Sequence, residues 1–164
     1  MPDSHPIRQH KISSALIALG AVFGAGGIGS LATIPNIPTW YARLNKPSFT
    51  PPNFLFGPVW PLLYLLMAVA FWRVLTLPDT RQRNMAVIWF VVQVVLNGLW
   101  SFAFFGFHSP IAGLATIAAL IVSVLLTIVT FARLDRLAAW LLAPYLAWIC
   151  FAAALNAGVF LLNR

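Results

Sequence analysis

Residues 40–60 hold the densest concentration of groups that could recognise a ligand, and they read WYARLNKPSFTPPNFLFGPVW. Aromatic rings are interspersed there with prolines and with two cations, Arg43 and Lys46. Proline fixes φ and removes a backbone donor, so this long segment suits a shaped, non-helical lid better than a simple connection. Aromatic faces bind flat apolar molecules, and the two cations could pair with acidic groups of such a molecule or with lipid headgroups.

Three further stretches carry polar and aromatic side chains at helical spacing. Residues three, four or seven positions apart share one face of a helix. Amides inside a membrane are costly unless paired, so we expect them to point toward the protein interior. Each residue alone could be an interfacial tryptophan or an interhelical hydrogen-bonding group, but together they favour a pocket beneath the lid. The sets are Trp60, Tyr64 and Met67; Gln93, Asn97, Trp100, Ser101 and Phe104; and Trp148, Ala152 and Asn156, with Pro144 one turn earlier.

Other kinds of chemistry find little support in the sequence. Cys150 is the single cysteine, which excludes an internal disulfide, and its position favours a small buried apolar residue. The three histidines, His5, His10 and His108, form no paired ligand set, and acidic residues are not clustered, so we expect no metal site. His108 as a haem ligand is a minor alternative. No nucleophile–base pair or phosphate loop is present.

The elements that must position these residues are membrane spans. The chain has 164 residues, of which 61% are hydrophobic and 8% charged, and its mean hydropathy is +0.89. A bilayer crossing needs roughly 20 apolar residues, and backbone groups must be satisfied within the bilayer, so each span should be a helix. We predict an all-α membrane protein, a five-transmembrane-helix bundle with a long structured loop between helices 1 and 2. The predicted spans cover residues 12–34, 59–77, 85–107, 111–132 and 137–162.

The domain organisation follows from these spans. Residues 1–11 are polar and predicted to form an N-terminal tail, and residues 12–164 a single transmembrane domain. The first apolar run is longer than the core of a usual signal peptide, so we predict a retained helix. Gly20, Gly24 and Gly27 share one face of that helix and could serve either internal packing or a dimer seam.

The net charge of +7 is divided unequally between the two ends of this predicted bundle. The cations form no continuous patch, which excludes nucleic-acid binding as the function. Positively charged residues gather on the cytoplasmic side of membrane proteins, so the distribution predicts a cytoplasmic N-terminus and an external long loop. The larger group is Arg8, Lys11, Arg73, Arg81, Arg83, Arg133 and Arg136, and the smaller group is Arg43, Lys46 and Arg164.

These motifs, in this order on five spans, resemble the TspO/MBR family, also described as translocator proteins, tryptophan-rich sensory proteins or peripheral benzodiazepine receptors. The resemblance covers nearly the whole chain after the tail and is of the bacterial type. The residues that carry it are Trp40-Tyr41, Lys46-Pro47, Pro51-Pro52, Gly57-Pro58-Val59-Trp60 with Tyr64 and Met67, Leu96-Asn97 with Trp100-Ser101, Pro144-Tyr145 with Trp148, and Leu155-Asn156.

The resemblance implies a five-helix bundle, usually a homodimer, with a pocket under the first loop that binds porphyrins or haem-like tetrapyrroles and, in some members, sterol-like lipids. It implies no tightly bound cofactor, and porphyrin or haem would be a ligand in a protein of the bacterial inner membrane, surrounded by membrane lipids. Arg43 and Lys46 would contact propionates or headgroups. The implied ligand-binding residues are Trp40, Tyr41, Pro51, Trp60, Tyr64, Gln93, Asn97, Trp100, Trp148 and Ala152, and the match at Gln93 is looser because relatives vary there.

The implied function is tetrapyrrole binding in transport, sensing or regulation of tetrapyrrole metabolism. One alternative is a light- and oxygen-dependent porphyrin-degrading enzyme, with Trp60 and Trp148 as candidate catalytic residues. A second alternative is a structural or regulatory membrane subunit. Animal members carry a sterol-recognition stretch that needs a tyrosine, where this chain has Phe160 in AGVFLLNR, so sterol binding loses that support.

Overall fold

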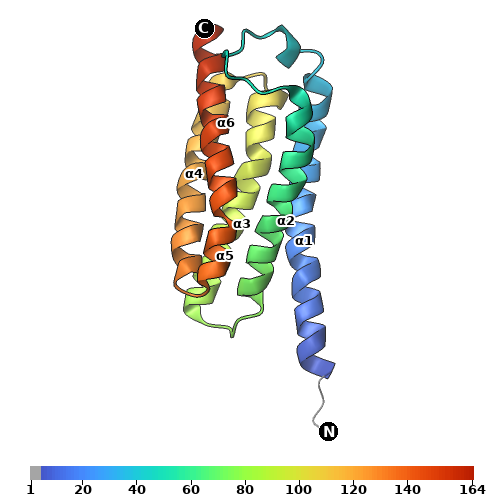
Figure 1. Cartoon of the computed structure of the whole chain (residues 1–164), viewed down its shortest axis with the longest axis vertical. Helices are drawn as coiled ribbons and strands as arrows, with labels where there is room; N and C mark the ends of the chain where they lie inside the picture. The colour runs from blue at the N-terminus through green and yellow to red at the C-terminus, as the bar shows by residue number, and fades with distance from the viewer. Residues whose placement is uncertain (1–4) are drawn as a thin grey trace.

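Long apolar runs separated by short polar turns form helices in the computed structural model, which describes residues 5–164 (Figure 1). Five helical segments are long and apolar enough to cross a membrane, the fifth being α5 and α6 together, and the described residues contain no strand. This confirms the predicted five-helix bundle. The bounds are α1 His5–Thr33, α2 Phe56–Leu75, α3 Arg81–Ser101, α4 Pro110–Ala132, α5 Arg136–Leu141 and α6 Ala143–Leu162.

Helices α2 and α3 begin at Phe56 and Arg81, a few residues before the predicted spans, and two other differences from the sequence prediction are larger. The first helix already begins at His5, within the predicted tail, whose residues 1–4 lie outside the described part of the chain. The last span is interrupted at Leu142, between α5 and α6. Pro144 lies in the first turn of α6 and has no N–H to donate to the carbonyl four residues earlier, so a continuous helix would lose a hydrogen bond there.

Short capped turns make the helices antiparallel neighbours. Thr80 and Ser109 cap α3 and α4, their hydroxyl oxygens accepting from Arg83 N and Ala112 N at 3.2 and 3.3 Å. Asp135 caps α5, and its Oδ1 accepts hydrogen bonds from the backbone N–H groups of Leu137 and Ala138. Such caps satisfy helix donors that have no partner within the helix. The turns place the start of α1 at the same end of the bundle as the α2–α3 and α4–α5 turns, and the C-terminus at the end that carries the long loop (Figure 1).

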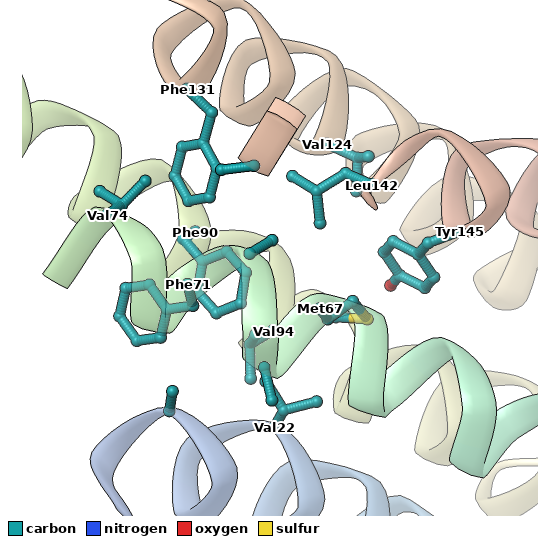
Figure 2. Close-up of a cluster of buried hydrophobic side chains, with 14 of the residues drawn as sticks. Val22, Met67, Phe71, Val74, Phe90, Val94, Val124, Phe131, Leu142 and Tyr145 are labelled. Carbon is teal, nitrogen blue, oxygen red and sulfur yellow. The ribbon is translucent and has the colours of Figure 1, made fainter. Parts of the chain in front are cut away.

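The half of the bundle near the α2–α3 and α4–α5 turns is filled by apolar side chains. Phe71 stacks on Phe90 at 4.0 Å between ring centroids, and Phe90 lies nearly parallel to Phe131 at 5.8 Å. Figure 2 shows these rings with Val74 and Val124 from neighbouring helices. Close packing of this kind stabilises a bundle through dispersion, which does not require water to be excluded. We call this region the filled half.

The long loop is structured, as predicted, and it is fastened to the C-terminal end of α6. Asn45 N donates to Asn163 Oδ1 at 3.0 Å, and Asn163 Nδ2 donates back to Asn45 O at 2.8 Å. Two residues further, Pro47 is buried against Gly158, where an added Cβ would overlap the proline ring. Reciprocal hydrogen bonds and a glycine-sized notch therefore fix this part of the loop.

A second attachment joins the loop to the α3–α4 turn. His108 stacks on Trp40 with 4.8 Å between ring centroids, and its Nε2 lies 2.8 Å from Asn36 Oδ1. Asn36 Nδ2 donates to Ala32 O at 2.8 Å, so its oxygen faces the imidazole and the proton is assigned to Nε2. His108 has φ of 51°, a conformation uncommon for a residue other than glycine, and these contacts hold it there.

Candidate ligand-binding cavity

A cavity of about 630 Å³ lies beneath the long loop, in the half of the bundle opposite the filled half. Residues from α1, α2, the end of α3 and α6 form its walls, and loop residues contribute to its roof. Most of the lining is apolar or aromatic, with a few hydroxyl and amide groups, which is the usual character of a small-molecule site. The lining residues are Phe23, Gly26, Gly27, Ser30, Thr33, Ile34, Ile37, Tyr41, Asn53, Phe56, Gly57, Trp60, Pro61, Tyr64, Trp100, Ser101, Phe104, Phe105, Trp148, Ala152, Leu155, Asn156 and Val159.

Glycines on α1 create part of the space. An added Cβ on Gly26 would overlap the Tyr64 ring, and one on Gly29 would lie 3.0 Å from Ser101 Oγ. The absent side chains let α1 approach α2 and α3 closely while the tyrosine keeps its position in the wall. Gly26 therefore sets where the Tyr64 ring can lie.

Indole rings from two helices meet in the cavity wall. Trp60 on α2 and Trp148 on α6 are nearly perpendicular, at 88° and 6.4 Å between ring centroids, and Trp60 also lies 5.4 Å from Tyr64. Phe56 adds an edge contact to Trp148 at 5.7 Å. The Trp148 Nε1 atom is buried and has no hydrogen-bond partner. The wall thus offers aromatic surfaces, whereas the unsatisfied Trp148 Nε1 has almost no exposed surface.

Side-chain amides fix the floor of the cavity. Tyr64 OH donates to Asn97 Oδ1 at 3.3 Å, and Asn97 Nδ2 donates to the buried Tyr145 OH at 2.9 Å. These bonds join α2, α3 and α6 at one level, and buried polar groups of this kind need their partners. Asn97 is itself buried and does not line the cavity, so it supports the Tyr64 ring from behind.

A second amide network lies higher in the wall. Trp100 Nε1 donates to Asn156 Oδ1 at 3.3 Å, and Asn156 Nδ2 donates to Pro110 O at 2.8 Å. The Asn156 side chain therefore joins α6 to the end of α3 and to the start of α4. Its geometry holds the Trp100 ring against the cavity.

The end of α3 continues as a π-helical turn, Phe102–Gly106. This turn buries Phe104 and Phe105, and both rings reach the cavity lining. Trp100 stacks on Phe104 at 5.7 Å, and Trp40 of the loop meets Phe104 edge-on at 5.4 Å. Single π-helical turns occur frequently at functional sites, because they turn side chains away from the regular helical face.

The structure brings together six of the ten residues that the sequence predicted to bind ligand, and these six line one cavity. Trp40 packs against the outer side of the lining, on Phe104 and His108. Pro51 borders a separate groove, and Asn97 lies beneath the floor. Gln93 is completely buried outside the cavity, and neither of its amide atoms has a hydrogen-bond partner. The six lining residues are Tyr41, Trp60, Tyr64, Trp100, Trp148 and Ala152.

The two loop cations lie near the cavity without lining it. Lys46 Nζ is 4.7 Å from the centroid of the Tyr41 ring and donates to Ala42 O and Leu44 O at 3.4 and 3.2 Å. Arg43 is exposed in the short helical turn Tyr41–Arg43. Burial raises the pKa of Tyr41, so this side chain stays an uncharged hydroxyl at neutral pH. Lys46 thus stands behind a residue of the cavity wall.

Sequence reasoning missed most of the α1 side of the cavity. Phe23, Gly26 and Ser30 line it, whereas the sequence indicates only internal packing or a dimer seam for the glycines of this helix. The spacing of Gly26 and Ser30, with Phe23 one turn earlier, could have indicated a second polar and aromatic face. Phe105 reaches the cavity because of the π-helical segment, for which no sequence signal was available.

Among the described residues, the fold does not bring together groups for the other kinds of site considered from the sequence. The part of the chain that the structure describes holds no group of three or more histidine, cysteine or acidic residues that could bind a metal ion. His108 is engaged with Asn36 and Trp40, away from the cavity lining. Cys150 is exposed on α6 rather than buried, so the prediction of a small buried apolar residue is wrong at this position.

Comparison with known proteins matches most of this chain to a single protein family. The family model described as "TspO/MBR family" matches residues 16–162. The chain is 46% identical over 161 residues to "Tryptophan-rich protein TspO" of Archaeoglobus fulgidus, covering 93% of this chain and 99% of the relative. It is 36% identical to "Protein CrtK" of Rhodobacter capsulatus over 149 residues, 89% and 84% of the two chains. It is 38% identical to human "Translocator protein" over 122 residues, 71% and 70% of the two chains.

Proposed function

This chain belongs to the TspO/MBR family of multi-pass membrane proteins, and we propose that its cavity binds a porphyrin or a haem-like tetrapyrrole. The observation that carries the proposal is the convergence of Trp60, Trp148 and Trp100 on one cavity of about 630 Å³ beneath an ordered loop. Relatives bear the names tryptophan-rich sensory protein and translocator protein, so we propose that binding serves sensing, transport or regulation of tetrapyrrole metabolism.

The lining fits the chemistry of a tetrapyrrole at both its apolar and its polar parts. A macrocycle presents wide π-faces, for which indole and phenol rings provide offset or edge contacts. Ionised propionates would emerge toward the loop, where Arg43 and Lys46 could form charge-assisted hydrogen bonds. Lys46 would have to leave its contact over Tyr41 to do so.

The proposal is tested by titrating the purified protein with protoporphyrin in the dark. We expect Trp60→Phe and Trp148→Phe each to weaken binding by about 0.5–1.5 kcal/mol, roughly two- to thirteen-fold, because each loses part of an aromatic contact. Trp140→Phe is the matched control, since Trp140 lies outside the cavity and is 73% exposed. Absence of saturable binding by the unmodified protein would exclude the proposed function.

A second candidate function is light-dependent porphyrin degradation, which the contact between Trp60 and Trp148 favours. Bound pigment, light and molecular oxygen would provide the oxidising chemistry. Illumination after the dark titration distinguishes the two functions: a catalytic role of the indoles requires Trp60→Phe and Trp148→Phe to slow bleaching more than they weaken dark binding. Equal losses assign the indoles to binding. A protein that neither binds nor bleaches porphyrin would instead fit a structural or regulatory subunit.

We also propose that the N-terminus faces the cytoplasm and that the host is the bacterial inner membrane. Cations gather at the end of the bundle that holds the N-terminus and the α2–α3 and α4–α5 turns, whereas Arg43, Lys46 and Arg164 lie at the other end. A periplasm-dependent reporter fused after Arg164 should therefore be active. Activity of a cytoplasm-dependent reporter at that position would reverse the assignment.

A homodimer through α1 is the assembly that we propose. Added Cβ atoms on Gly20 and Gly24 would meet nothing within 4 Å, so these two glycines form an uncovered small-residue face, whereas Gly27 lines the cavity. Such faces let membrane helices approach closely. Gly24→Leu should convert a dimer into monomers in cross-linking or light-scattering experiments, and an unchanged dimer would place the seam elsewhere.

A further inference from the structure

A second hollow lies on the outside of the bundle, between α2 and α6, and is distinct from the cavity. This α2–α6 groove has a volume of about 590 Å³. Among the residues that the structure describes, Trp148 is the one that lines both the groove and the cavity. The groove is lined by Pro51, Leu55, Val59, Leu63, Pro144, Ala147, Trp148 and Phe151.

The groove exists because α2 and α6 have their main partners elsewhere. α2 packs chiefly against α1 and α5, and α6 chiefly against α4, so the two helices meet each other only briefly. Pro144 at the start of α6 and the loop residue Pro51 both line the groove. Phe49 of the loop covers Phe151 at 6.4 Å between ring centroids. The loop therefore forms one border of a hollow that the helices leave unfilled.

The lining selects a purely apolar occupant. Every side chain around the groove is aliphatic, prolyl or aromatic, and its one polar atom, Trp148 Nε1, is buried. The groove lies on two membrane-spanning segments, so the medium outside it is the hydrocarbon of lipid chains. An empty hollow would forfeit dispersion contacts along its whole lining, whereas a flexible hydrocarbon chain can follow its shape.

A second protein copy fits this surface less well than a lipid chain does. Close helix packing in membranes uses small residues, which let two backbones approach. Trp148 and Phe151 are large and partly exposed, and they would hold a neighbouring helix away from the groove. The uncovered small-residue face of this protein lies instead on α1.

We propose that the α2–α6 groove is a binding site for the acyl chain of a membrane phospholipid, and that Trp148 couples its occupancy to the cavity. The indole forms a shared wall, held by edge or tilted contacts with Phe56 and Phe151, both at 5.7 Å, and by no hydrogen bond from its Nε1. A chain seated in the groove limits the outward movement of this ring. The coupling rests on the proposed tetrapyrrole binding, whereas the lipid site does not.

The lipid site is tested with a phospholipid that carries a photoactivatable diazirine in its acyl chain. The full-length protein is reconstituted in vesicles containing a trace of this lipid, illuminated, and mapped by mass spectrometry. We expect cross-links to concentrate on Ala147 and Phe151. Ala147→Trp, a substitution at an exposed position, fills the groove and should reduce these cross-links to the level of ordinary lipid-facing residues. Val122→Trp on α4 is the matched control, since Val122 is 57% exposed and lies outside the groove.

Each outcome decides a separate part of the proposal. Cross-links spread evenly over all lipid-facing residues, or unchanged by Ala147→Trp, would show surrounding lipid only and overturn the site. Porphyrin titration of the same variants then tests the coupling, which predicts altered affinity for Ala147→Trp and unaltered affinity for Val122→Trp. Loss of the cross-links with unaltered affinity would overturn the coupling and leave the lipid site standing. Absence of porphyrin binding in every variant would instead overturn the proposed function and with it the coupling.

Discussion

The two halves of the bundle are built from similar side chains, yet one is filled and the other is hollow. In the filled half, Phe71, Phe90 and Phe131 lie nearly parallel and leave the interior packed. Beneath the loop, Trp60 and Trp148 meet edge to face around a cavity of about 630 Å³. Aromatic content alone therefore does not decide whether the interior of a membrane bundle is closed.

The difference lies in what fixes the side chains. Dispersion between flat rings holds the filled half together, and nothing in that arrangement needs a polar partner. In the hollow half, Asn97 and Asn156 each bind groups from two other helices and thereby hold Tyr64 and Trp100 in place around the empty volume. Such networks are costly to leave incomplete, so they fix the positions of these walls.

The largest effect should follow from removing the central ring of the filled half. Phe90→Ala should destabilise the protein by about 3 kcal/mol, the lower end for such a change, because the transfer from water contributes little inside a bilayer. Ile88→Ala on the same helix, where Ile88 is 52% exposed, should change stability by less than about 0.5 kcal/mol. Unfolding in detergent–lipid mixtures measures both. Equal losses would show that the filled half is no more tightly packed than the lipid-facing surface.

A smaller effect, confined to the hollow half, should follow from adding one methyl group to α1. Gly26→Ala places a Cβ where the Tyr64 ring now lies, so the ring must shift toward the cavity. Overpacking of this kind costs roughly 1–3 kcal/mol, and we expect porphyrin affinity to fall about tenfold.

Gly98→Ala is the matched control for this change. Its added Cβ would lie 3.6 Å from Ala25 O, an ordinary contact. Both substitutions replace a helical glycine, so their intrinsic helix effects are alike. Dark titration of the two variants gives the comparison, and equal affinities would show that Tyr64 does not border the bound ligand.

The sequence predicted the helices better than it predicted the cavity. Apolar runs long enough to cross a bilayer were sufficient for the bundle, because spans obey the same length and hydrogen-bonding constraints in every membrane protein. The break at Leu142 was foreseeable from Pro144, since proline interrupts helical hydrogen bonding. Cys150 shows the limit, because the face that a helix turns to lipid has the same composition as the face that it buries.

The cavity residues were predicted where they share a helical face and missed where they depend on tertiary contacts. Trp60 and Tyr64 follow regular spacing and line the cavity together. Gln93 and Asn97 follow the same spacing one turn apart, but both lie deeper, because α3 presents that part of its face to other helices. Phe105 reaches the cavity through a π-helical turn, which periodicity at 3.6 residues cannot indicate.

Weakening the attachment of the loop should loosen the loop without disturbing the cavity walls below it. Asn163→Ala removes the reciprocal hydrogen bonds with Asn45 and should lower the free energy of local opening by about 1 kcal/mol. Amide hydrogen exchange in residues 44–50 should then accelerate roughly fivefold. Arg164→Ala, at the next position, serves as control. Unchanged exchange would mean that the notch between Pro47 and Gly158 holds the loop without the asparagines.

The smallest effect concerns the opposite end, where Arg73 Nε donates to Asp135 Oδ2 at 2.7 Å. Burial by itself raises the pKa of Asp135, but the hydrogen bond and charge of Arg73, together with backbone donors from Ala138 and Leu137, outweigh it and place the pKa below its ordinary value. The carboxylate is therefore favoured in the folded state. Its contribution is complete above the unfolded-state pKa of about 4 and is lost as pH falls through the lower folded-state value.

Asp135→Asn isolates this charge, because asparagine is also a good helix cap. The variant should lose about 0.5–1 kcal/mol between pH 5 and 8, the range for partly exposed ion pairs, and the loss should vanish under strong acid. Asp79→Asn should have no measurable effect on stability, since the Asp79 side chain is 75% exposed and its Oδ1 lies 3.6 Å from Arg83 Nη1. Thermal unfolding in detergent at several pH values measures both. A loss that persists in acid would assign the effect to the cap rather than to the charge, and the filled half would then end in a hydrogen-bonded turn with no electrostatic contribution.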